Sequence, residues 1–161
     1  MIECKVETVS FDELSQMGVV MLTEKNGRRV LPIWIGLFEA QAILFKLQNS
    51  FFPRPLTHDL LKNCIEILGG KPVRVVIHKM EQSTFHAEIV IMDGKTEVKI
   101  DSRPSDALAW AVRVNAPIFI DKKVMEENSI LREEFVKEQK GKEYKKYLET
   151  FDEEDSGKLK H

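Results

Sequence analysis

Two short segments of this 161-residue chain carry the same kinds of residue at the start of a predicted helix. They are Arg54–Asp59, with the sequence RPLTHD, and Asp101–Asp106, with the sequence DSRPSD. Each combines an arginine, a proline, a hydroxyl and an aspartate. The first N–H groups of a helix lack partners and favour anions, and an adjacent arginine can donate two hydrogen bonds to a phosphate. The two segments therefore indicate a site for a phosphate-bearing ligand, provided that they meet in space.

The carboxylates and the histidine of these segments add two kinds of chemistry. Carboxylate oxygens are the ligands that hard divalent cations prefer, and a histidine can transfer protons near neutral pH. His58 is expected to point away from the apolar face of its helix, toward solvent or toward a site. Glu39, early in the preceding predicted helix, is a similar but weaker candidate.

Each of these residues also has a structural explanation. Thr57 is expected to cap its helix. Asp59 and Asp106 lie in a first helical turn, where a negative charge is favoured by ~0.3–1 kcal/mol. Arg54 and Arg103 could pair with nearby aspartates, and Asp101, between a strand and a buried helix, is expected to be partly covered. Both readings stay open at this point.

The strands that must position these segments follow from alternating apolar residues and turn signals. Asn26-Gly27 and Asp93-Gly94 each predict a tight hairpin turn. The predicted strands are Ile2–Phe11, Gly18–Thr23, Arg28–Ile35, Val73–Lys79, Thr84–Met92, Glu97–Asp101 and Pro117–Ile120. They predict a mixed or antiparallel sheet with an N-terminal hairpin and a three-strand meander.

Three main helices are expected to pack on this sheet, which makes the fold class α+β. They run from Gly36 to about Gln48, from Thr57 to Leu68, and over Ser105–Val114. The second has a predicted apolar face of Leu60, Leu61, Cys64, Ile65 and Leu68, so Cys64 is expected to be buried. The third is apolar on nearly every side, which predicts a buried helix.

Composition limits the possible partners. The formal charge of −2 does not favour binding nucleic acid through bulk positive charge, so a phosphate would need a local cluster of arginines or a bound cation. The N-terminus shows no secretory signal, and the longest apolar stretch, Ala107–Ile120, is too short to span a membrane. We expect a cytoplasmic protein with reduced thiols. Residues 1–130 are predicted to form the main domain, and 131–161 a charged helical extension with a frayed tail.

Three blocks of the sequence resemble the signature blocks of the bifunctional nuclease family. They read LPIWIGLFEAQAI (Leu31–Ile43), RPLTHDLL (Arg54–Leu61) and IDSRPSDALAWAVRVNAPIFI (Ile100–Ile120). The resemblance implies nuclease activity on DNA and RNA and a homodimer. The positions that match the family pattern are Glu39, Arg54, His58, Asp59, Asp101, Arg103, Ser105 and Asp106.

Two hypotheses follow. In the first, the protein is a metal-assisted nuclease using Mg²⁺ or Mn²⁺. Its catalytic residues are His58, Asp59, Asp101 and Asp106, its substrate-binding residues are Arg54, Arg103 and Ser105, and its metal ligands are Asp59, Asp101, Asp106 and Glu39. In the second, the protein is a non-catalytic, dimeric module that binds an anion or a protein, and its Arg–Asp pairs are structural. Both depend on whether the two segments converge.

Overall fold

A computed structural model describes residues 1–12 and 14–137 of the chain, and its centre is a single mixed sheet. The strand order is β6-β5-β4-β7-β1-β2-β3-β8, and only β4 and β7 pair in parallel among the described strands. The strands are β1 (Ile2–Asp12), β2 (Met17–Glu24), β3 (Arg29–Gly36), β4 (Lys71–Glu81), β5 (Thr84–Asp93), β6 (Thr96–Ser102), β7 (Ile118–Ile120) and β8 (Ile130–Leu131). The predicted α+β class and mixed sheet are confirmed.

Both predicted hairpins are present, and their glycines have the backbone conformation that such turns require. Gly27 has φ of 73° between β2 and β3, and Gly94 has φ of 61° between β5 and β6. A positive φ is readily adopted by glycine because it has no Cβ. β1–β3 and β4–β6 are thus two antiparallel meanders, which the short strand β7 joins into one sheet.

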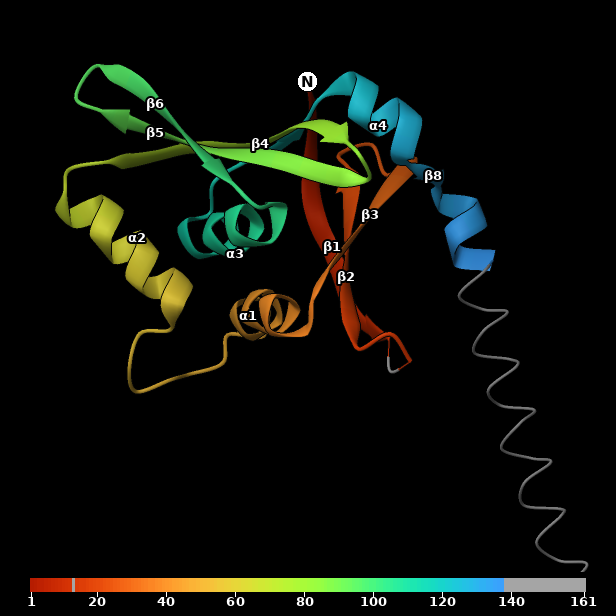
Figure 1. Ribbon diagram of the computed structural model, residues 1–161, viewed down its shortest axis with the longest axis horizontal. Helices are drawn as coiled ribbons and strands as arrows, with labels where there is room; N and C mark the ends of the chain where they lie inside the picture. Colours follow the sequence, from red (N-terminus) through yellow and green to blue (C-terminus); the bar gives the residue numbers. More distant parts are fainter. Residues whose placement is uncertain (13, 138–161) are drawn as a thin grey trace, which may run out of the picture.

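The helices are α1 (Leu37–Leu47), α2 (Thr57–Ile67), α3 (Pro104–Val114) and α4 (Lys122–Asn128). Figure 1 shows α1 and α3 in the concave space between the two halves of the sheet, with α2 beside them. Leu108 and Trp110 of α3 are fully buried, as the apolar sequence of this helix predicts. Pro104 occupies the first turn of α3 and Arg103 is its N-cap. Arg103 is thereby placed at the point where β6 leads into the buried helix.

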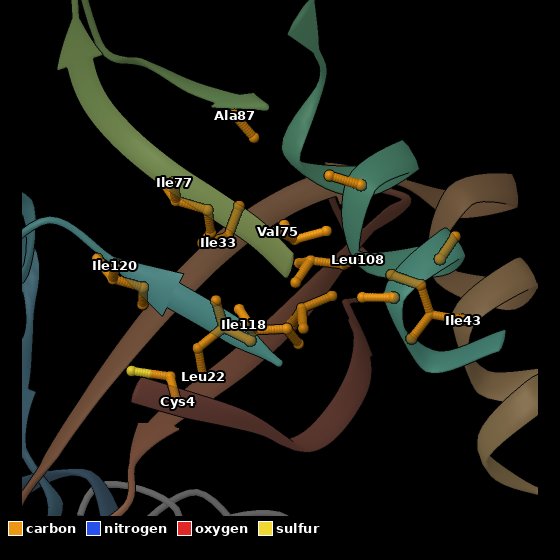
Figure 2. Close-up of a cluster of buried hydrophobic side chains, with 14 of the residues drawn as sticks. Cys4, Leu22, Ile33, Ile43, Val75, Ile77, Ala87, Leu108, Ile118 and Ile120 are labelled. Atoms are coloured by element: carbon orange, nitrogen blue, oxygen red, sulfur yellow. The ribbon is translucent and has the colours of Figure 1, made fainter. Parts of the chain in front are cut away.

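The hydrophobic core joins both meanders to α3. Figure 2 shows Val75 of β4, Ile118 of β7, Leu22 of β2 and Leu108 of α3 in one cluster. Because α3 is anchored among these side chains, its first turn is held at a fixed place relative to the sheet.

A glycine allows α1 to approach the sheet closely. A Cβ at Gly18 of β2 would lie 2.2 Å from the Cβ of Ala40, so the backbone of β2 runs directly against α1. Glu39, the neighbour of Ala40, lies in the first turn of α1 and is therefore held near the start of α3.

Two expectations about α2 are wrong. The N-cap is Leu56 rather than Thr57, because the carboxylate of Asp59 accepts a hydrogen bond from the Leu56 N–H at 2.9 Å. Cys64 is exposed rather than buried. Within the predicted apolar face, Ile65 is buried, Leu61 is half-buried, and Leu60 and Leu68 are exposed. The main contact of α2 is with α3, so only one side of the helix is covered.

The end of the described chain contains α4 and β8, which the sequence analysis did not predict. After α4, β8 pairs with the beginning of β3, and residues 132–137 are helical. Arg132 forms an ion pair with Glu7 of β1 at 2.5 Å. The remainder of the predicted charged extension, residues 138–161, lies outside the described residues. Within the described part of the chain, none of the helices has the length and apolar character needed to cross a membrane.

Candidate active site

The starts of α2 and α3 meet. The Nε2 atom of His58 lies 2.9 Å from Oδ1 of Asp106, although the two residues are 48 positions apart in the sequence. The segments at residues 54–59 and 101–106 therefore converge through these two side chains, which is the condition that the sequence analysis left open. The first turn of α1 joins them, since its Glu39 lies against Arg103.

Arg103 is at the centre of this cluster. Its Nε and Nη2 donate to Oδ2 and Oδ1 of Asp106 at 2.7 and 3.1 Å, and its Nη1 donates to Oε1 of Glu39 at 3.1 Å. A guanidinium has five N–H groups, so one on each terminal nitrogen is left without a partner among the described residues. The side chain is 66% exposed. Arg103 is thus oriented by two carboxylates and can still donate hydrogen bonds to a ligand.

Asp106 fixes the state of the histidine beside it. Burial alone would raise the pKa of Asp106, but hydrogen bonds from Arg103 and His58 outweigh burial and lower the pKa below its ordinary value of 3.8. Asp106 is therefore a carboxylate at neutral pH and can only accept hydrogen bonds. It follows that Nε2 of His58 carries the hydrogen when the ring is neutral, and Nδ1 is the basic nitrogen. A His–Asp pair of this kind is suited to proton transfer.

Two open hollows adjoin the cluster. The His58 hollow has a volume of about 580 Å³, and its lining includes Phe38, Glu39, His58, Arg103 and Asp106. The Trp34 hollow has a volume of about 320 Å³, and its lining includes Trp34, Glu39, Arg103 and Ser105. Glu39 and Arg103 line both hollows and so form the wall between them. A substrate that is bound at Arg103 can extend to either side.

Asp59 differs from Asp106 in its surroundings. Its Oδ2 accepts from the Leu56 N–H, and its Oδ1 accepts from Nε of Arg113 at 2.7 Å. Burial would raise the pKa of Asp59, but the Leu56 and Arg113 hydrogen bonds outweigh it and lower the pKa below 3.8. Both oxygens are thus occupied, and neither hollow is lined by Asp59. These contacts assign Asp59 to holding α2 against α3.

Arg113 is the residue that sequence reasoning missed. Its side chain is only 3% exposed. Besides Asp59, it donates to the carbonyl oxygens of Ala109 at 2.8 Å and Ala42 at 3.1 Å, and so links α3 to α1 and α2. The signal in the sequence was an arginine within a helix that is otherwise almost entirely apolar. Such a residue is buried only when its charge is paired.

The remaining predicted residues are placed differently. Arg54 and Asp101 are exposed, line neither hollow, and form no side-chain hydrogen bond or ion pair with any described residue. Asp101 thus lies at the surface, outside both hollows. It lies in β6, opposite Glu88, and β6 is an edge strand of the sheet formed by the described residues. Ser105 is 5% exposed and lines the Trp34 hollow.

The predicted metal ligands do not gather in this arrangement. No group of three or more His, Cys, Asp or Glu side chains among residues 1–12 and 14–137 is placed to hold a metal ion. The Arg103 guanidinium lies between the carboxylates of Glu39 and Asp106 and is their positive partner. With His58 neutral, the formal charge of Glu39, Arg103 and Asp106 together is −1. An additional positive charge at this cluster, from protonated His58 or from a cation, would therefore strengthen the binding of a phosphate group.

Comparison with known proteins identifies the family of this chain. The family model of the bifunctional nuclease domain matches residues 20–133, which include helices α1 to α4 and the site. The chain belongs to the bifunctional nuclease domain family.

The relatives include proteins with and without an assigned activity. An uncharacterized protein of Mycobacterium tuberculosis is 37% identical over 129 residues, which are 80% of this chain and 77% of the relative. Bifunctional nuclease 2 of Oryza sativa subsp. japonica is 28% identical over 64% of this chain and 33% of its own length. Bifunctional nuclease 1 of Oryza sativa subsp. indica is 25% identical over 74% of this chain and 37% of its own length. This chain thus spans about a third of the length of each of these two rice proteins.

Proposed function

We propose that this chain is a nuclease that hydrolyses phosphodiester bonds of DNA and RNA. The observation that carries the proposal is the His58–Asp106–Arg103 cluster, open to a hollow, in a chain of the bifunctional nuclease domain family. The names of the rice relatives support the same activity. Hydrolysis by water needs no 2′-hydroxyl group, so one site of this kind can act on both nucleic acids.

In the proposed reaction, Arg103 holds the phosphodiester through its two remaining N–H groups. Nδ1 of His58 accepts a proton from a water molecule, whose oxygen forms a new bond to phosphorus. The bond between phosphorus and one ester oxygen breaks, and that oxygen takes up a proton from solvent, to which His58 later releases the proton that it accepted. Asp106 keeps the imidazole in the correct tautomer and stabilises its protonated form. Arg103 stabilises the negative charge that grows on the phosphoryl oxygens.

Assistance by Mg²⁺ or Mn²⁺ remains a prediction. The formal charge of −1 at the cluster favours it, because a metal ion would supply the missing positive charge at the phosphate. The Arg103 pairing with Glu39 and Asp106 opposes it. The cleavage rate is measured with and without EDTA and after either ion is added back. The result tests metal assistance alone, because the proposed roles of His58 and Arg103 do not depend on it.

The activity is tested with fluorescently labelled single-stranded DNA and RNA and the purified full chain. The His58→Gln variant should cleave both about 10²–10⁴-fold more slowly, which is the usual contribution of a general acid or base. The matched control is His78→Gln, an exposed histidine of β4 that lines neither hollow. Equal cleavage by the wild type and His58→Gln contradicts the proposed mechanism, and intact substrate with the wild type contradicts the proposed activity.

The alternative is a non-catalytic, dimeric binding module with structural Arg–Asp pairs. The Asp59–Arg113 pair, whose arginine is buried, favours it, because that pair stabilises the fold without facing either hollow. Binding of DNA or RNA without cleavage would support this alternative. The predicted homodimer is tested by sedimentation, and the predicted cytoplasmic location by fractionation of the source cells.

A further inference from the structure

We propose that Trp34 and Phe38 stack on the bases of an unpaired strand, one on each side of the phosphate that Arg103 holds. The inference rests on the proposed nuclease function and names its substrate more closely. It makes the preferred substrate a single-stranded or locally unpaired segment of DNA or RNA. Trp34 and Phe38 would determine this specificity, while the chemistry stays with His58, Arg103 and Asp106.

Both aromatic side chains face solvent beside the site. Trp34 of β3 is 55% exposed, although its neighbours Ile33 and Ile35 are 2% and 7% exposed. Successive side chains of a strand point to opposite faces, so Ile33 and Ile35 enter the core and Trp34 points outward. Phe38, in the first turn of α1, is 79% exposed.

Trp34 and Phe38 lie on either side of Arg103, each in a different hollow. Trp34 lines the Trp34 hollow and Phe38 lines the His58 hollow, and Arg103 and Glu39 form the wall that the two hollows share. A phosphate at Arg103 therefore has an aromatic ring on each side, reached through a separate hollow. A strand that crosses this wall places the bases on either side of its bound phosphate next to the two rings.

Base stacking also answers the question of how a chain with a formal charge of −2 holds nucleic acid. Phosphate neutralisation is weak here, because the cluster of Glu39, Arg103 and Asp106 is itself negative. Aromatic stacking is independent of net charge and tolerates any base. It requires bases whose faces are free, and in a duplex those faces are covered by the neighbouring base pairs. The substrate that fits is therefore unpaired.

The two tryptophans of the chain make the proposal directly measurable. Trp110 is fully buried, so the fluorescence that iodide can quench comes from Trp34. A cleavage-resistant, phosphorothioate-linked single strand should quench the iodide-accessible fluorescence as it binds. A blunt duplex of the same sequence should not quench it, and neither should inorganic phosphate. The Trp34→Phe variant should lose the iodide-accessible signal, which assigns that signal to Trp34.

Affinity for the single strand tests the second ring. Phe38→Ala should weaken binding by roughly tenfold or more, the usual effect of removing one stacking aromatic. The matched control is Phe51→Ala, which removes an aromatic that is 88% exposed and lines neither hollow. Circular dichroism establishes that both variants fold.

The proposal is overturned if iodide cannot reach Trp34 in the free protein, if single strand and duplex quench it equally, or if Phe38→Ala binds like Phe51→Ala. These outcomes are distinct from failure of the proposed function. Quenching by the single strand without any cleavage would support the stacking site and contradict the proposed hydrolysis. Equal cleavage of single strands and duplexes without quenching would support the nuclease activity and contradict the stacking site.

Discussion

Nε of Arg113 lies 2.7 Å from Oδ1 of Asp59, and this ion pair separates the roles of two aspartates that occupy equivalent places in the sequence. Asp59 and Asp106 each lie in the first turn of a helix. Arg113 is in the last turn of α3 and draws Asp59 toward the interface between α2 and α3. Asp106 instead faces His58, Arg103 and the hollow. Of the two aspartates in these similar segments, Asp59 therefore has a structural role and Asp106 faces the site.

The Asp59–Arg113 pair should respond unequally to removal of its two partners. Asp59→Asn leaves a guanidinium that is 3% exposed without a counter-charge, so the free energy of unfolding should fall by about 3–5 kcal/mol. Arg113→Met leaves a carboxylate that is 38% exposed and still accepts the Leu56 N–H, so the loss should be smaller, about 1–2 kcal/mol. Urea denaturation measures both. A larger loss for Arg113→Met than for Asp59→Asn would contradict this account.

Acid should destabilise the fold through the same two aspartates. The pKa values of Asp59 and Asp106 are lower in the folded chain than their ordinary value of 3.8, since hydrogen bonds outweigh burial at both. Each ionised carboxylate therefore favours the folded state above pH 3.8, and that contribution is lost as the pH falls through the lower folded pKa. The difference in unfolding free energy between the wild type and Asp59→Asn should stay constant from neutral pH to just above pH 3.8, shrink as the pH falls from there to the lower folded pKa, and level off below it. A difference that persists unchanged in strong acid would contradict the assignment.

Much of the fold is predictable because its signals are local. Asn26-Gly27 and Asp93-Gly94 specify their turns through glycine, and the apolar sequence of Ser105–Val114 specifies a buried helix. The errors on α2 have a different origin. Periodicity places Cys64 and Leu68 on an apolar face, but it cannot tell how wide a surface α3 offers to cover that face.

The site was predictable only in part for a similar reason. The similarity of the two segments correctly indicated that His58, Arg103 and Asp106 belong together. It could not show that Arg54 and Asp101 are exposed beyond the hollows, because each lies only a few residues from the cluster. Nor could it assign a partner to Arg113, since that depends on how α1, α2 and α3 pack.

Replacement by alanine should affect the free energy of unfolding differently at two glycines near the site, Gly18 and Gly36. A Cβ at Gly18 would lie 2.2 Å from the Cβ of Ala40, which cannot move without its helix. Gly18→Ala should therefore lower the unfolding free energy by about 3 kcal/mol, the upper end for overpacking. A Cβ at Gly36 would lie 2.2 Å from Oε2 of Glu39, the end of a flexible side chain. Gly36→Ala should change stability by less than about 1 kcal/mol. Its cleavage rate should fall, because the added methyl group displaces the Glu39 carboxylate that pairs with Arg103. Thermal denaturation checks the two stability changes, and oligonucleotide cleavage by the same preparations checks the expected change in rate.

The arginine of the site should not be replaceable by lysine, although lysine keeps the positive charge. Arg103 binds both oxygens of Asp106 and one of Glu39, and still has two N–H groups for a phosphate. A lysine ammonium has three N–H groups in all and no planar fork, so it cannot keep these three bonds and also donate two to the substrate. Arg103→Lys should therefore lower kcat/KM for oligonucleotide cleavage by about 10²-fold. The matched control is Arg54→Lys, because Arg54 is exposed and lines neither hollow. If Arg54→Lys is the variant that loses activity and Arg103→Lys keeps it, the substrate phosphate is held by the α2 segment, and the cluster at Arg103 has a structural role.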